Sequence, residues 1–183
     1  LLKEDIPIVL ADEDSPDFHS IHLDDIKGAE MAVNYLIKQG YQKISFINGF
    51  KESQHGINRL KGVKNTLLKN ELNLNPRLLK NGDFHTEDGY HSMQEILELP
   101  EEEWPSAVFA ASDNQAIGVL QAMEEKGLKA PGDIAVIGYD NIELAKYLKI
   151  TTIWQPMYQL GHLAIEVLLK AINGELKEKY NKE

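Results

Sequence analysis

The sequence predicts an α/β fold built on a doubly wound, mostly parallel sheet. Short apolar segments of strand length alternate with amphipathic helical segments from residue 6 to residue 174. The clearest unit spans residues 106–140, where two nearly continuous apolar strands flank one amphipathic helix. Such strands are buried on both faces, and a helical crossover makes them parallel. Asp113 and Asp140 follow these strands, so both carboxylates are expected at the carboxyl edge of the sheet, where open α/β sheets bind ligands.

Seven strands are expected from short runs that are rich in apolar or β-branched residues. Because the runs alternate with helical segments, most of these strands should pair in parallel. In chain order they are residues 6–11, 20–23, 44–48, 78–83, 107–111, 134–138 and 151–155.

Six helices are expected, most of them with a recognisable start or stop signal. Glycines at positions 40, 127 and 174 end three of them. The acidic run 101–103 is expected to be a solvated loop, and residues 175–183 a charged, frayed tail. The helices begin at Asp24 or Asp25, after the polar loop 49–55, at Thr86, at Ser112 or Asp113, near residue 142 and near residue 157.

The composition is that of an ordinary globular protein of 183 residues, with a formal net charge of −10. The chain has no cysteine, which excludes disulfides, a thiolate nucleophile and cysteine-bound zinc. No apolar run approaches the roughly 20 residues of a membrane span, and residues 1–5 lack the apolar core of a signal peptide. An acidic surface repels a phosphate backbone, so the chain itself is not expected to bind DNA.

Sequence motifs for catalysis and for cofactor binding are absent, so neither an enzyme nor a cofactor is predicted. The cluster of His85, Glu87, Asp88 and His91 could suggest a metal site. On a helix, however, His85 and His91 are rotated about 240° from each other and do not share a face. Glu87 and His91 do share one, but an exposed i,i+4 pair explains them better than a metal does.

Several segments that follow one another over nearly the whole chain resemble a known family. They are LDD..GAE.AVNYLI.QGYQKISFI (23–47), NRLKG (58–62), GDF..EDGY (82–90), VFAASDNQAIGVLQAMEEKGL (108–128), APGDIAVIGYDN (130–141) and ITTIWQP (150–156). Together they resemble the effector-binding core of LacI/GalR-type transcriptional regulators.

The resemblance implies the type I periplasmic-binding-protein-like fold, in which two doubly wound lobes hold a ligand in the cleft between them. Residues 24–149 would form one complete C-terminal lobe. Residues 1–23 would be a remnant of the N-terminal lobe, and residues 150–183 the strand and helix that return to it. The first strands and helices of that lobe, and the final crossing back, are expected to be missing.

A sugar-like or nucleoside-like ligand needs charged groups that bind neighbouring hydroxyls, and a flat aromatic ring for its apolar face. The residues also have plainer interpretations: Arg59 as a surface helix residue, Phe84 as core, Asp140 and Asp113 as helix caps, and Trp154 as packing. By resemblance, the ligand contacts are Arg59, Asp140, Phe84, Ser112, Gln155 and Asp12, with Ser53 and His55 in a loop that selects the effector.

The leading hypothesis is a non-enzymatic sensor, the effector-binding domain of a bacterial LacI-type regulator that binds a small, sugar-like metabolite. DNA would be bound by a helix-turn-helix headpiece that no segment here matches. The hypothesis implies a cytoplasmic homodimer without a membrane partner, whose interface candidates are the exposed faces of the helix carrying Ile117 and of residues 142–148. The alternatives are an extracytoplasmic solute-binding protein of a transporter, a small α/β enzyme, and a regulator whose corepressor is a protein.

Overall fold

The structure is a computed structural model that describes residues 6–176 and 178–182, and it contains two compact units. The larger unit is Asp25–Trp154, and the smaller one is formed by the described residues within Leu1–Asp24 and Gln155–Glu183. Residues 1–5, considered above as a possible signal peptide, and positions 177 and 183 of the predicted tail lie outside the described residues.

The larger unit is built on a five-stranded sheet in the order β4-β3-β5-β6-β7, and every neighbouring pair is parallel. The prediction of a doubly wound parallel sheet is therefore confirmed. The chain builds outward from β3 in both directions, so a topological switch point lies between β3 and β5. The strands are β3 (Ile44–Asn48), β4 (Leu79–Asn81), β5 (Ala107–Ala110), β6 (Ala135–Asp140) and β7 (Thr151–Trp154).

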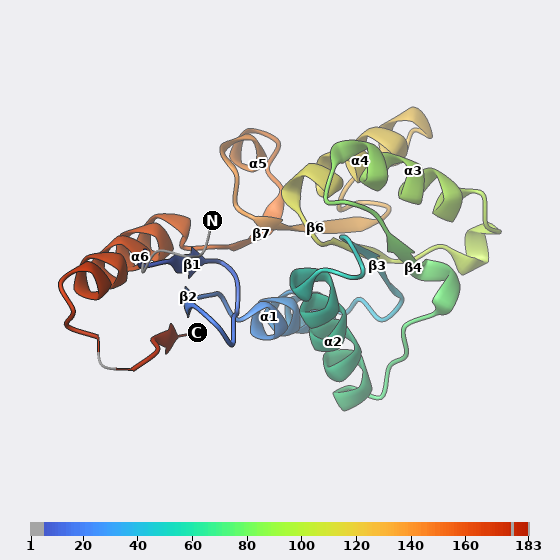
Figure 1. Cartoon of the computed structure of the whole chain (residues 1–183). Helices are drawn as coiled ribbons and strands as arrows, with labels where there is room; N and C mark the ends of the chain where they lie inside the picture. Colours follow the sequence, from blue (N-terminus) through green and yellow to red (C-terminus); the bar gives the residue numbers. More distant parts are fainter. Residues whose placement is uncertain (1–5, 177, 183) are drawn as a thin grey trace. The chain divides into compact units, whose positions relative to one another are not determined.

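Helices cover both faces of this sheet, with α1 and α2 on one side and α3 and α4 on the other (Figure 1). The period-two alternation of β5 explains the layers, because Phe109 packs with the α1–α2 cluster and Val108 with the α3–α4 cluster. Among the described residues, none of the helices combines the length and the apolar character needed to cross a membrane. The helices are α1 (Asp25–Lys38), α2 (Gln54–Lys69), α3 (Thr86–Leu97), α4 (Asp113–Glu125) and α5 (Glu143–Tyr147), with 3₁₀ turns at Pro76–Leu78 and Glu101–Glu103.

The smaller unit is a three-stranded parallel sheet in the order β1-β2-β8, which packs against α6. Its core is small and consists of Ile21, Leu160 and Val167 with partly buried neighbours. The predicted frayed tail differs from what the structure shows, because β8 pairs with β2 and Tyr180 packs on the core. The elements are β1 (Val9–Ala11), β2 (His19–Ile21), α6 (Met157–Ile172) and β8 (Asn181–Lys182).

Several helix starts differ by one or two residues from the sequence expectation. The N-cap of α3 is His85 rather than Thr86, and Asp88 accepts hydrogen bonds from the backbone N–H groups of Asp83 and His85. Helix α2 begins at Gln54, so His55 lies in its first turn and not in the preceding loop. The predicted acidic loop 101–103 is a 3₁₀ turn.

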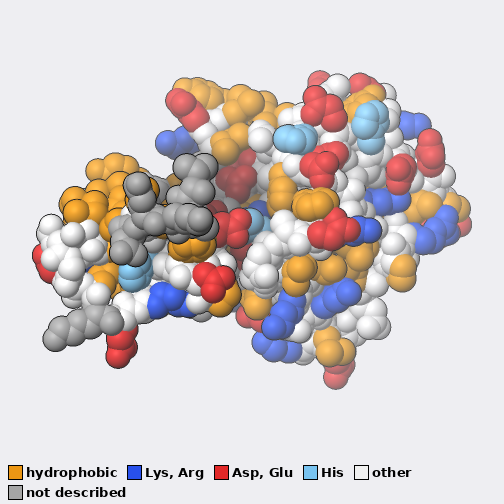
Figure 2. Space-filling view, viewed as in Figure 1, with side chains coloured by type: hydrophobic (Ala, Val, Ile, Leu, Met, Phe, Trp, Pro, Cys, Tyr) orange, Lys and Arg blue, Asp and Glu red, His pale blue; other side chains and the backbone are white. Residues whose placement is uncertain are grey.

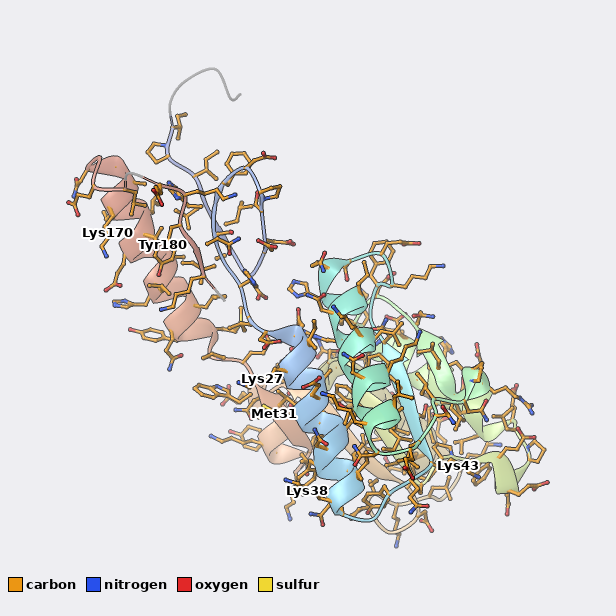
Figure 3. All side chains as sticks on the ribbon, turned by 90° about the horizontal axis from the view of Figure 1, so that it is seen from below. Lys27, Met31, Lys38, Lys43, Lys170 and Tyr180 are labelled. Carbon is orange, nitrogen blue, oxygen red and sulfur yellow. The ribbon has the colours of Figure 1, made fainter. Side chains whose placement is uncertain are left out.

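Close helix contacts in the larger unit depend on glycine. A Cβ atom built on Gly62 of α2 would lie 2.3 Å from the carbonyl oxygen of Ile26 and 2.9 Å from the Cβ of Ala29. Helices α1 and α2 can therefore approach each other closely only because this position has no side chain. The outer side of α1 carries Lys27, Met31 and Lys38 (Figure 3).

We expect the substitution Gly62→Ala to destabilise the protein by about 2 kcal/mol, because overpacking against a backbone carbonyl outweighs the roughly 1 kcal/mol by which alanine favours a helix. Urea unfolding followed by circular dichroism would measure the change. The matched control is Gly132→Ala, since Gly132 is exposed and the nearest atom to an added Cβ lies 3.8 Å away. Equal stabilities of the two variants would contradict this account.

Candidate functional site

Six of the eight predicted ligand residues lie at the carboxyl edge of the five-stranded sheet. Ser53 and His55 are at the start of α2, Phe84 precedes α3, Ser112 precedes α4, and Asp140 ends β6. Arg59, one turn further along α2, reaches the same edge, because its Nη1 donates a hydrogen bond of 2.6 Å to the carbonyl oxygen of Ala111, directly after β5. This edge includes the switch point between β3 and β5, the kind of place where open α/β sheets generally bind ligands.

Arg59 is not the exposed helix residue of its plainer interpretation, because only 5% of it is accessible to solvent. Its Nε donates to Oδ1 of Asp25 at 2.7 Å, and its Nη1 donates to Ala111. A guanidinium group has five N–H donors, and among the described residues Nη2 of Arg59 has no hydrogen-bond acceptor. Arg59 is thus held rigidly and still has donors for a further polar partner.

Two aromatic rings lie close to the guanidinium group. The Cζ of Arg59 lies 3.9 Å from the ring centroid of Tyr139 and 5.5 Å from that of Phe84. Glycines make room for both rings, since an added Cβ would collide with the Tyr139 hydroxyl at Gly28 and with the Phe84 ring at Gly49. The sequence analysis missed Tyr139, which lies in the GYD motif. Tyr139 is two residues after Ile137 on β6, so both side chains point to the α1–α2 face of the sheet.

Asp25 is the charged partner of Arg59, and the sequence analysis interpreted it only as a helix cap. It is the first residue of α1, it is buried, and it also lies 2.7 Å from Nδ1 of His55. Burial by itself raises the pKa of Asp25, but the hydrogen bond from His55 and the charge and hydrogen bond of Arg59 outweigh it, so the net pKa lies below its ordinary value. Asp25 is therefore ionised at neutral pH and neutralises Arg59.

The turn after β6 is strained and is held by two side chains. Asp140 and Asn141 have φ angles of 112° and 61°, which non-glycine residues rarely adopt. The Asn141 N–H donates to Oγ1 of Thr152, and the Ile142 N–H donates to the carboxylate of Asp113. Asp113 thus anchors this turn and is not the helix cap predicted from the sequence. Burial raises the pKa of Asp113 above the ordinary value, although hydrogen bonds to its carboxylate from the Thr152 side chain and from the backbone, including that of Ile142, oppose the shift.

Ser112 and Ser53 use their hydroxyl groups mainly within the protein. Ser112 caps α4 by accepting from the Gln115 N–H, and its Oγ donates to the carbonyl oxygen of Phe84 at 2.9 Å. Ser53 caps α2 in the same way by accepting from the Gly56 N–H, and it donates to Phe50. Both hydroxyls therefore shape the loops of the edge first, and each retains one lone pair for a ligand.

Asp12 and Gln155, the remaining two predicted contacts, belong to the smaller unit. Asp12 follows β1 with a φ of 64°, and its N–H donates to the carbonyl oxygen of Ile21 at 2.7 Å. Gln155, which comes after β7 and before α6 in the chain, is 9% exposed. Trp154 ends β7 and is 60% exposed, which argues against its role as a packing residue.

A cavity of about 440 Å³ lies at a different place in the larger unit. It is lined by the last turn of α1 and the residues after it, including Tyr35 and Gln39, and by the segments around β6 and β7, including Val136 and Lys149. None of the predicted ligand residues lines it. We therefore locate the candidate site from its chemistry, at the carboxyl edge.

We expect Asp25→Asn to destabilise the protein by about 3 kcal/mol at pH 7, because it leaves the charge of Arg59 buried without a partner. The pKa of Asp25 is lower in the folded state than in the unfolded state, so its stabilising effect is present above pH 3.8 and is lost as the pH falls through the folded-state value. Urea unfolding of both proteins between pH 7 and pH 3 should show the difference shrinking. A difference that does not change with pH would contradict the ion pair.

Comparison with known proteins identifies the family. Residues 33–182 match the family described as "Periplasmic binding protein-like domain". The chain is 38% identical over 173 residues to the HTH-type transcriptional repressor CytR of Escherichia coli K12, and this match covers 92% of the chain and 50% of the repressor. It is also 38% identical over 178 residues to the repressor PurR of Salmonella paratyphi B, and this match covers 94% of the chain and 52% of that repressor. The chain thus spans about half the length of the curated relatives it matches.

Solved structures agree with this match. A regulatory protein of the LacI family from Chloroflexus aggregans superposes with a TM-score of 0.89 at 28% identity, covering 96% of this chain and 64% of that one. The complex of the transcriptional regulator CelR with cellobiose superposes with a TM-score of 0.84 at 30% identity, and the superposition covers 90% of this chain and 50% of that one. The chain therefore belongs to the periplasmic binding protein-like domain family, in the form that serves as the effector-binding core of LacI/GalR-type regulators.

Proposed function

We propose that the chain is the effector-sensing part of a LacI-type transcriptional regulator and binds a sugar-like or nucleoside-like metabolite at the carboxyl edge of its five-stranded sheet. The observation that carries this proposal is Arg59, a buried guanidinium group close to the rings of Tyr139 and Phe84, with Nη2 donors that meet no acceptor among the described residues. Two donors on one nitrogen suit the oxygens of neighbouring ligand hydroxyls.

The backbone of the candidate residues supports a binding role. Asp12, Phe84 and Asp140 all have positive φ angles, of 64°, 67° and 112°. Such strain costs about 1–3 kcal/mol for each residue and is typical of binding sites, where the surrounding structure holds the side chain in place. Two further points stay predictions within this proposal. One is that the ligand contacts Ser112, Gln155, Ser53 and His55, and the other is that residues 24–149 form one lobe.

The effector would act by population shift. A ligand that binds one conformation of the regulator more tightly than another shifts the equilibrium by that difference in affinity. Coupling of this kind between effector and operator is typically about 1–3 kcal/mol. The "HTH-type" relatives bind DNA through a helix-turn-helix, and we propose the same for the whole regulator, which would place it in the cytoplasm with the operator.

A homodimer would match the two-fold symmetry of an operator. Figure 2 shows hydrophobic side chains gathered over α5, where Leu144, Tyr147 and Leu148 are exposed. Ile117, the other interface candidate, is only half-exposed on α4. We therefore propose that α5 contributes more of the contact than α4 does.

The alternative of a transporter solute-binding protein shares the fold, but the comparisons favour repressors. The relatives are also transcriptional repressors and not enzymes. A protein corepressor is a further alternative, and in that case screens of small metabolites would be negative.

The test is calorimetric titration of the full-length regulator against sugars and nucleosides. We expect one of them to bind, and Arg59→Ala and Asp140→Asn each to weaken its affinity at least tenfold, because each removes a charge-assisted hydrogen bond. The matched control is Arg77→Ala, since Arg77 is an exposed arginine paired with Glu103 on the 3₁₀ turn before β4. Affinities within twofold of the wild type for both site variants would show that the site is wrong.

A further inference from the structure

The cavity of about 440 Å³ in the larger unit lies at the start of β6 and β7, and none of the predicted effector contacts lines it. We propose that this cavity is a separate binding site for a small carboxylate with an apolar or aromatic body. The proposal concerns a different part of the unit from the effector site and does not rest on the proposed function.

The cavity lies where β6 extends beyond its neighbour β7. The register of the two strands begins with Ile137 opposite Thr151, so Ala135 and Val136 of β6 have no described strand on that side. The Ala135 N–H donates to the carbonyl oxygen of Ser106 on the β5 side at 3.0 Å. Because successive N–H groups of a strand point to opposite edges, the Val136 N–H points to the open edge. A strand edge of this kind offers backbone hydrogen-bonding groups to an occupant of the cavity.

The walls of the cavity are mainly apolar and come from both layers of helices. Leu36 belongs to α1 on one face of the sheet, and Leu120 belongs to α4 on the other. Tyr35 and Tyr41 add two aromatic side chains with hydroxyl groups. The volume lies within the range of about 300–1,000 Å³ that is usual for small-molecule sites. The cavity therefore suits a small ligand with an apolar or aromatic body.

The charge of the cavity is positive although the chain as a whole is acidic. Of the described residues that line it, Lys149 is charged, and none is an aspartate or a glutamate. Across the described part of the chain, the Lys149 ammonium group has neither an ion pair nor a hydrogen bond. A single ammonium group matches the single charge of a carboxylate, whereas a phosphate dianion needs more donors. The lone positive charge therefore favours a monocarboxylate.

The backbone holds Lys149 in a strained conformation at the edge of the cavity. The Ile150 N–H donates to the carbonyl oxygen of Ala145 at 2.9 Å and so closes α5, which leaves Lys149 with a φ of 56°. Glycine occupies the corresponding position at the ends of α1, α4 and α6, whereas α2 and α5 have Glu71 and Lys149 there. Strain of this kind is typical of binding sites. It therefore supports a role for the Lys149 side chain in binding.

The C-terminal end of α1 also borders the cavity, and free carbonyl groups there would repel an anion. Two of these carbonyl groups are already satisfied within the protein. The Gly40 N–H donates to Ile37 at 2.9 Å, and the Tyr41 N–H donates to Leu36 at 3.1 Å. The end of the helix therefore opposes a carboxylate less than an uncapped end would.

The first experiment is calorimetric titration of the full-length regulator with three carboxylates: phenylacetate, indole-3-acetate and hexanoate. The matched control for each is its neutral amide. We expect at least one carboxylate to bind, and its amide to bind at least fivefold more weakly, because the amide cannot accept a charge-assisted hydrogen bond from Lys149. Equal affinities of acid and amide, or no binding of any of the three acids at millimolar concentration, would overturn the proposal.

The second experiment repeats the titration of the tightest acid with variants. Lys149→Gln should weaken binding at least fivefold, and Thr151→Trp should abolish it by filling the cavity from an exposed position on its wall. The matched control is Lys146→Gln, since Lys146 is exposed on the same helix end but does not line the cavity. Wild-type affinity in Lys149→Gln, or an equal loss in Lys146→Gln, would show that the acid binds elsewhere. If Thr151→Trp does not fold, the two lysine variants decide.

Discussion

The carboxyl edge of the larger unit depends on one buried ion pair, between Asp25 of α1 and Arg59 of α2. Burying two charges is costly, and the cost is offset only when their remaining hydrogen-bonding groups are satisfied. Here the carboxylate meets both Arg59 and His55, and the guanidinium group meets Ala111 and the face of Tyr139. The pair therefore joins two helices and two strands at the point where the ligand is proposed to bind.

The rest of the unit serves to bring these groups together. Helices α1 and α2 pack on the same face of the sheet, and Gly62 lets them approach closely enough for Asp25 to reach Arg59. The parallel order β4-β3-β5-β6-β7 then places the ends of β3, β5 and β6 beside one another. A buried hydrogen bond from Nε2 of Gln115 to the carbonyl oxygen of Asn48 connects the α4 and β3 sides of the switch point. Rigidity of this kind reduces the entropy lost on binding.

Sequence reasoning predicted which residues share this edge of the sheet, but it assigned the roles of several side chains incompletely. It expected Arg59 and Asp140 at one rim, and both lie there. It treated Asp113 as a cap, whereas Asp113 holds the turn that carries Asp140, and it treated Asp25 as a cap, whereas Asp25 neutralises Arg59. Caps are inferred from local sequence, and the same carboxylate can serve a distant partner that no local pattern reveals.

By itself, the sequence determined the alternation of strands and helices, the parallel sheet and the edge at which polar residues gather, because these follow from short-range periodicity and from the geometry of crossover connections. Only the tertiary structure decided which donor meets which acceptor. Asp25 and Arg59 are 34 residues apart, and Gln115 and Asn48 are 67 apart. Such pairs form only when the strand order and the close packing of helices bring their elements together, and so the charge state of the site could not be read from the chain alone.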